Sequence, residues 1–313
     1  MLKGLVIVIA AVFLLPVLAV AAEQPDAWDG EVLDVFIIDG QSNAAYGTDN
    51  NVAVVNQDFQ DAPSKKLLYY GTDSAPIGYV SLSNPTYDTT YESYSIHEMY
   101  DSGWKIGGYE PGLAYTISQR TNHDVLILNL GVNGATVSQL TPEGVAGQYG
   151  KPILTHALEE VKDQYDTINM IGFMWAQGES DRLTSIPAYE SDFMKVFGMM
   201  EEYGAKKCYI VESRSNWGNS VAAQVDLMHK YSNVLLGTSI ANTFTTDNGL
   251  LISDGVHYSQ HARDIIAKII GEKVDLNEPE NSGTYEILGA VVVVSIVAVI
   301  VAAAGLIFIR RAD

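Results

Sequence analysis

The sequence predicts an α/β protein in which a parallel sheet is covered by helices on both faces. Strand-like and helix-like segments alternate along most of the chain, which is typical of this class. The first strand-like run, Val32–Ile38, is rich in valine, isoleucine and phenylalanine, and Gly40 then marks a sharp exit from it. Residues 23–286 are long enough to form one large domain with a substantial core.

Five strands and five helices are expected, in alternation. The predicted strands are Val32–Ile38, Val125–Leu130, Ile168–Trp175, Lys207–Glu212 and Val234–Thr238. The predicted helices are Gly112–Thr121, Pro152–Tyr165, Pro187–Tyr203, Ser220–Tyr231 and Ser259–Val274. In the last of these, isoleucines recur at helical spacing beside charged residues, which predicts one buried face.

An insertion at about residues 46–110 interrupts this alternation. It is polar and rich in tyrosine. An insertion of this length between two βα units is uncommon unless it is functional or forms short strands of its own. Its tyrosines and Trp104 would supply either flat faces for sugar rings or a small core for the insertion itself.

The N-terminal end has the sequence pattern of a targeting segment and is not expected to be part of the fold. Lys3 precedes an uncharged apolar run that closes on Ala19-Val20-Ala21, an A-x-A cleavage pattern. Residues 1–22 are therefore predicted to be a signal peptide, with an uncleaved N-terminal anchor as the alternative.

The C-terminal end predicts a single membrane span. Residues 287–309 carry no charge and, at about 1.5 Å per residue, form a helix of roughly 35 Å, enough to cross a bilayer. The arginines that follow mark residues 310–313 as a cytoplasmic tail. The domain of residues 23–276, joined by a polar linker at 277–286, is thus expected outside the cell membrane, with the lipid bilayer as a partner of the C-terminal helix.

Composition excludes several classes of function. The formal net charge of −20 repels phosphate and leaves no basic stripe, so nucleic acid is not an expected partner. His257 and His261 are four residues apart but lack the glutamate of H-E-x-x-H, so no metal site is predicted. No G-x-G-x-x-G follows the first strand, and no cofactor is expected. Cys208, the only cysteine, is expected to be a small buried core residue.

Three residues have the chemistry of a nucleophilic triad. Ser42 follows the first predicted strand directly, where open α/β sheets place their ligands. Asp254 stands three residues before His257, just ahead of the last predicted helix. A serine hydroxyl becomes a strong nucleophile when a histidine accepts its proton, and an acid fixes the tautomer of that histidine. G-x-S-x-G is absent around Ser42, which argues against an α/β-hydrolase nucleophile elbow.

Two further strand exits are expected at the same sheet edge. One carries Asn133-Gly134-Ala135-Thr136 and the other carries Trp175-Ala176-Gln177-Gly178-Glu179. Acyl transfer needs hydrogen-bond donors aimed at the developing oxyanion, and a glycine amide with a side-chain amide would supply them.

These segments together resemble the SGNH/GDSL hydrolases. The series G-Q-S-N (40–43), N-G-A-T (133–136), W-A-Q-G-E-S-D (175–181) and D-G-V-H (254–257) is most similar to the sialate O-acetylesterase-like branch, which also holds acetyl-xylan esterases. The resemblance covers about residues 32–274 and implies a flavodoxin-like, three-layer α/β/α fold. Asp39 departs from the pattern, because a small apolar residue is usual there.

The resemblance also implies roles for single residues. Ser42 would be the nucleophile, His257 the base and Asp254 the orienting acid. The oxyanion hole would consist of the backbone amides of Ser42 and Gly134 and the side chain of Gln177. Glu179 is an alternative triad acid, or else a residue that holds the Gln177 loop by hydrogen bonds.

The expected function is that of a membrane-anchored, outward-facing serine esterase. It would hydrolyse O-acetyl esters on carbohydrates, of the sialate or acetyl-xylan type, through an acetyl-enzyme and without a cofactor. The alternative is a catalytically weak or inactive cell-surface carbohydrate-binding protein on the same scaffold. The presence of all three triad residues opposes that alternative.

Overall fold

The chain divides into two units, residues 1–275 and residues 276–313. The computed structural model describes residues 32–45, 67–72, 91–95 and 108–276, so every element discussed below lies in the first unit. The predicted signal peptide, linker, membrane helix and cytoplasmic tail lie outside the described residues. Among the residues that are described, no helix has the length and apolar character needed to span a bilayer.

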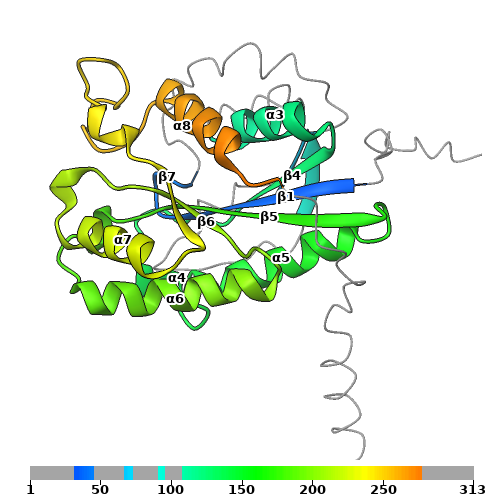
Figure 1. The fold of residues 1–313 in the computed structure, drawn as a ribbon, viewed down its shortest axis with the longest axis horizontal. Coiled ribbons are helices and arrows are strands. Elements are labelled where there is room, and N and C mark those ends of the chain that lie inside the picture. The colour runs from blue at the N-terminus through cyan, green and yellow to red at the C-terminus, as the bar shows by residue number, and fades with distance from the viewer. Residues whose placement is uncertain (1–31, 46–66, 73–90, 96–107, 277–313) are drawn as a thin grey trace, which may run out of the picture. The chain divides into compact units, whose positions relative to one another are not determined.

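A seven-stranded sheet forms the centre of the first unit (Figure 1). Its spatial order is β3-β2-β4-β1-β5-β6-β7. The strands are β1 (Val32–Gly40), β2 (Leu67–Thr72), β3 (Tyr91–Ser95), β4 (Asp124–Asn129), β5 (Thr167–Ala176), β6 (Cys208–Val211) and β7 (Val234–Thr238). All neighbours pair in parallel except β2 and β3, which are antiparallel. The predicted parallel sheet is confirmed, and the insertion contributes its two strands at one edge.

Helices cover both faces of the sheet, as predicted (Figure 1). On one face, α3 (Glu110–Thr121) packs against α8 (Gln260–Lys273). On the other face lie α4 (Val137–Leu140), α5 (Gly147–Val161), α6 (Ile186–Glu202) and α7 (Asn219–Lys230). Three short 3₁₀ turns follow the ends of strands: η3 (Glu179–Asp181), η4 (Ser215–Trp217) and η5 (Ile240–Thr243).

The core explains why β1 occupies the middle of the sheet. Every residue of β1 after Val32 is buried, because the strand pairs on both sides and is covered on both faces. Leu33, Val35 and Ile37 alternate onto one face and join the aromatic side chains Phe193 and Phe197 of α6. Burial of each such side chain contributes about 1.5–3 kcal/mol relative to exposure.

Two helices differ from the sequence prediction. The predicted start of the second predicted helix at Pro152 is wrong, because α5 begins at Gly147 and contains the proline. A glycine is required there, since a Cβ atom would lie 2.0 Å from the carbonyl oxygen of Thr141. The four-residue helix α4 was not predicted. Its signal was present in Thr136 and Gln139, because the Gln139 side chain accepts a hydrogen bond from the Thr136 amide at 2.9 Å, as in a capping box.

Candidate active site

The loop that carries Ser42 leaves β1 through a turn that only glycine can form. Gly40 has φ of 143°, and a Cβ atom there would lie 2.2 Å from the carbonyl oxygen of Ala176 on β5. The next amide, that of Gln41, donates to the same oxygen at 3.1 Å. This close approach of β1 and β5 fixes the position of Ser42 at the carboxyl edge of the sheet.

The loop between β7 and α8 presents His257 to Ser42. Residues Leu251 and Tyr258 form a short antiparallel bridge that closes this loop, and the Ile252 amide donates to the His257 carbonyl at 2.9 Å. At its end, the Ser259 hydroxyl accepts from the Ala262 amide and caps α8. The histidine is therefore held between a closed loop and the start of a helix.

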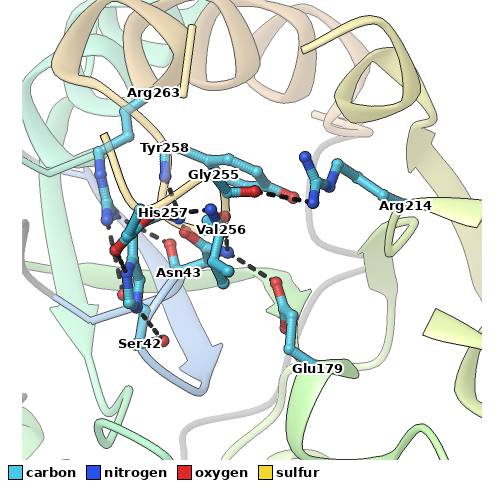
Figure 2. Close-up of polar contacts among 10 residues, drawn as sticks. Ser42, Asn43, Glu179, Arg214, Gly255, Val256, His257, Tyr258 and Arg263 are labelled. Atoms are coloured by element: carbon cyan, nitrogen blue, oxygen red, sulfur yellow. Dashed lines mark hydrogen bonds and ion pairs between the residues drawn. The ribbon is translucent and has the colours of Figure 1, made fainter. Parts of the chain in front are cut away.

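Ser42, His257 and Asp254 form a continuous line of hydrogen bonds. The Ser42 hydroxyl lies 2.9 Å from Nε2 of His257, and Nδ1–H of the same ring donates to Oδ2 of Asp254 at 2.6 Å (Figure 2 shows the Ser42–His257 contact). Because a carboxylate only accepts, this contact fixes the tautomer that leaves Nε2 free to take the serine proton. The structure thus brings together the three residues of the predicted triad.

Hydrogen bonds stabilise the ionised form of Asp254. Burial alone would raise the pKa of Asp254, but donation from the His257 ring and from the backbone amides of His257 and Val256 outweighs it. The pKa of Asp254 is therefore lowered. An acid in this state is available to stabilise a protonated imidazole.

Glu179, the alternative acid, contacts a different partner. Its Oε1 accepts from Nδ2 of Asn43 at 2.6 Å, and its Oε2 is buried without a hydrogen-bond partner. Burial raises the pKa of Glu179, against the opposing effects of the Asn43 hydrogen bond and of the charges of His257 and Arg214. In this structure the carboxylate bonded to His257 is that of Asp254.

The two remaining predicted residues lie at the exits of β4 and β5. Gly134 is exposed, has φ of 73°, and accepts from the Ser180 hydroxyl at 3.1 Å through its carbonyl. Gln177 is buried, and its Nε2 donates to Asp181, to the Ala135 carbonyl at 3.2 Å and to Oε1 of Gln41 at 3.3 Å.

These contacts leave no free N–H on the Gln177 amide, and its Oε1 has no partner. The strongest of its acceptors is the Asp181 carboxylate, which draws the amide into the protein. A free oxyanion donor would face the ester instead. The role of Gln177 as an oxyanion donor therefore stays a prediction.

Several residues that support the site were not singled out from the sequence. Asn43 and Asp181 stand inside motifs that were recognised, so the motifs themselves contained the signal. Arg263 lies one helical turn into α8, is almost fully buried, and donates to the carbonyls of Asn43 and Ala45, both at 2.9 Å. It resembled a surface residue of an amphipathic helix, and only the folded arrangement shows that it holds the Ser42 loop.

Comparisons with known proteins identify the family and support the fold. Residues 32–274 match the model of a family described as carbohydrate esterase, sialic acid-specific acetylesterase. The protein NanS has 15% sequence identity and a TM-score of 0.51, with 78% of this chain and 96% of that chain covered. A protein from Arabidopsis thaliana has 15% identity and a TM-score of 0.52, with 76% of this chain and 96% of that chain covered. At these identities the structures show the fold alone. No protein with a curated description matches the chain.

Proposed function

Because this chain belongs to the sialic acid-specific acetylesterase family of carbohydrate esterases, we propose that Ser42 is the nucleophile with which it removes O-acetyl groups from sugars. Membership of the family makes the chain a carboxylic ester hydrolase. The observation that carries the proposed residue roles is the line of hydrogen bonds from Ser42 through His257 to Asp254.

The proposed reaction begins with attack of Ser42 Oγ on the acetyl carbonyl carbon. The serine proton moves to Nε2 of His257, and Asp254 stabilises the imidazolium. When the tetrahedral intermediate collapses, the ester C–O bond breaks and Nε2 returns the proton to the sugar oxygen. Water, deprotonated by His257, then attacks the acetyl group on Ser42, which releases acetate and restores the hydroxyl.

The developing oxyanion needs donors at the same edge of the sheet. We assign the backbone amides of Ser42 and Gly134 to this role, as the resemblance to the family implies. Gln177 would join them once one of its N–H groups leaves Ala135 or Gln41. Stabilisation of the oxyanion by these two backbone amides needs no metal or cofactor.

The proposed substrate is an O-acetylated carbohydrate of the sialate type, with acetyl-xylan as the neutral alternative. The family description supports the first. The proposed location is outside the cell membrane, with the domain secreted by residues 1–22 and held by the helix of residues 287–309. The charge pattern of the two chain ends supports this location.

Turnover by the full chain tests the proposal. Purified protein in detergent should release acetate from p-nitrophenyl acetate, from O-acetyl sialic acid or from acetylated xylan, and Ser42→Ala should lower kcat by at least about 10³-fold. Ser215→Ala, a change of an exposed serine in η4, is the control and should leave kcat unchanged. Near-normal turnover by Ser42→Ala would overturn the assignment. Sugar binding by the wild type without any hydrolysis would favour the carbohydrate-binding alternative.

A further inference from the structure

Asn43, the residue after the proposed nucleophile, is bonded to the backbone on both sides of the proposed base. It is 1% exposed. Its Oδ1 accepts from the Tyr258 amide at 3.0 Å, and its Nδ2 donates to the Val256 carbonyl at 3.4 Å (Figure 2). Val256 and Tyr258 flank His257 in the chain. One side chain therefore ties the loop of the nucleophile to the loop of the base.

The orientation of the Asn43 amide is set by Glu179. Nδ2 donates to Oε1 of Glu179 at 2.6 Å, the shortest of the three contacts. If the amide turned over, its oxygen would face the Glu179 carboxylate and the Val256 carbonyl, and its NH₂ group would face the Tyr258 N–H. All three contacts would then be repulsive. Oε1 of Glu179 is an acceptor both in the carboxylate and in a carboxylic acid protonated on Oε2, so Glu179 selects the orientation that holds Tyr258.

Arg214 also contacts the loop that carries His257. The Arg214 guanidinium donates to the Gly255 carbonyl at 2.9 Å, and its charge lies near Glu179. The backbone from Gly255 to Tyr258 is thus bonded directly to the loops after β1 and β6, and the loop after β5 supports it through Asn43. Figure 2 shows Asn43 between the His257 loop and Glu179.

We infer that Asn43 and Glu179 are positioning residues that hold the His257 imidazole at hydrogen-bond distance from Ser42. Neither touches the reacting atoms. A displacement of about 1 Å in a catalytic group can lower turnover by about 10²-fold. Loss of this pair should therefore lower kcat while leaving the substrate contacts that determine KM in place. The inference rests on the proposed function, because it assigns His257 as the base.

An exchange of charge and amide between the two positions tests the inference. Asn43→Asp keeps the acceptor for Tyr258 but places two carboxylates together, and should lower kcat by about 10²-fold or more. Glu179→Gln removes the selection between the two orientations and should lower kcat by about tenfold. In the double variant, the amide introduced at position 179 donates to the carboxylate introduced at position 43. Its kcat should return to within about tenfold of the wild type.

Asn169 offers a control at the opposite end of the sheet from Ser42. It is half-buried near the start of β5, and its Nδ2 donates to Oδ1 of Asp34 at 2.8 Å. Asn169→Ala and Asn43→Ala should both lower the melting temperature, because each removes a side-chain hydrogen bond. Only Asn43→Ala should lower the kcat of the folded protein by more than about tenfold, with KM changed by less than about threefold.

The outcomes separate this inference from the proposed function. A wild type without esterase activity would remove the proposed function itself. An active wild type with an equally active Asn43→Asp variant would overturn the inference alone. Equal losses of kcat in the two single variants and in the double variant, with melting temperatures unchanged, would also overturn it, because no rescue would follow from restored complementarity.

Discussion

Asp254 and His257 are three residues apart, and the carboxylate of one contacts the other twice. Oδ2 of Asp254 accepts from the His257 ring at 2.6 Å, while its Oδ1 accepts from the His257 backbone amide at 3.0 Å. The acid therefore fixes both the ring and the local turn that carries it. An isolated aspartate elsewhere in the site would orient the ring but would not shape the loop.

Replacement of Asp254 tests whether its carboxylate is the acid that orients His257. Asp254→Asn keeps the size of the side chain and removes the charge, so we expect kcat to fall by about 10²–10⁴-fold because the imidazolium loses its partner. Steady-state kinetics on one acetyl ester, with a thermal melt for each variant, is the measurement. Glu179→Gln should show a smaller fall in kcat than Asp254→Asn. A well-folded Glu179→Gln without activity, beside an active Asp254→Asn, would instead make Glu179 the triad acid.

Replacement of Gly40 should abolish the folded site. Gly40→Ala places a Cβ atom 2.2 Å from the Ala176 carbonyl oxygen at φ of 143°, so we expect destabilisation by about 3 kcal/mol or more. Gly134→Ala is the control, because φ is also positive there but no atom lies within 4 Å. That variant should lose only about 1–2 kcal/mol. Urea denaturation of both variants measures the difference. Equal losses of stability would show that the clash with Ala176 adds nothing to the backbone strain at positive φ.

Asp39 should make the stability of the domain depend on pH. Burial raises its pKa to about 8, against the opposing hydrogen bond from the Gly40 amide. The native state therefore holds a proton that the unfolded chain has released, and stability should fall as pH rises from about 4 to about 8.

The variant Asp39→Asn isolates this effect. It keeps an acceptor for the Gly40 amide and cannot ionise. Between pH 5 and pH 9 its free energy of unfolding should fall by several kcal/mol less than that of the wild type, because one pKa unit corresponds to about 1.4 kcal/mol. Urea denaturation at both pH values measures the two slopes. Identical pH dependence in the variant and the wild type would show that Asp39 does not titrate in this range.

Deletion of residues 285–313 should release the esterase domain into the medium. The reason is that the uncharged stretch of residues 287–309 is the proposed membrane anchor. Fractionation of cells followed by an esterase assay of medium and membranes measures the release. As a control, protease added to intact cells that carry the full chain should digest the domain. A domain that stays protected while known surface proteins are cut would contradict the outward orientation.

Most of the strands and helices follow from local patterns in the sequence. The five predicted strands match β1, β4, β5, β6 and β7 to within a few residues, because a fully buried strand is a short apolar run ended by turn residues. The insertion was harder to interpret, since its tyrosines fit either a core or a binding surface. Its strand β2 pairs with β4, and β3 pairs with β2, so both depend on a contact between segments far apart in the chain.

The sequence by itself determined the class of the fold and the chemical types at the site. Chain order placed Ser42 after the first strand and Asp254 beside His257, because both features are local. Only the tertiary structure decided which carboxylate reaches the histidine, where the Gln177 amide points, and that Asn43 and Arg263 hold the Ser42 loop. These contacts join residues more than 130 positions apart or depend on which of several buried acceptors is nearest. These contacts depend on how the loops pack at one edge of the sheet, and a local sequence pattern does not determine that packing.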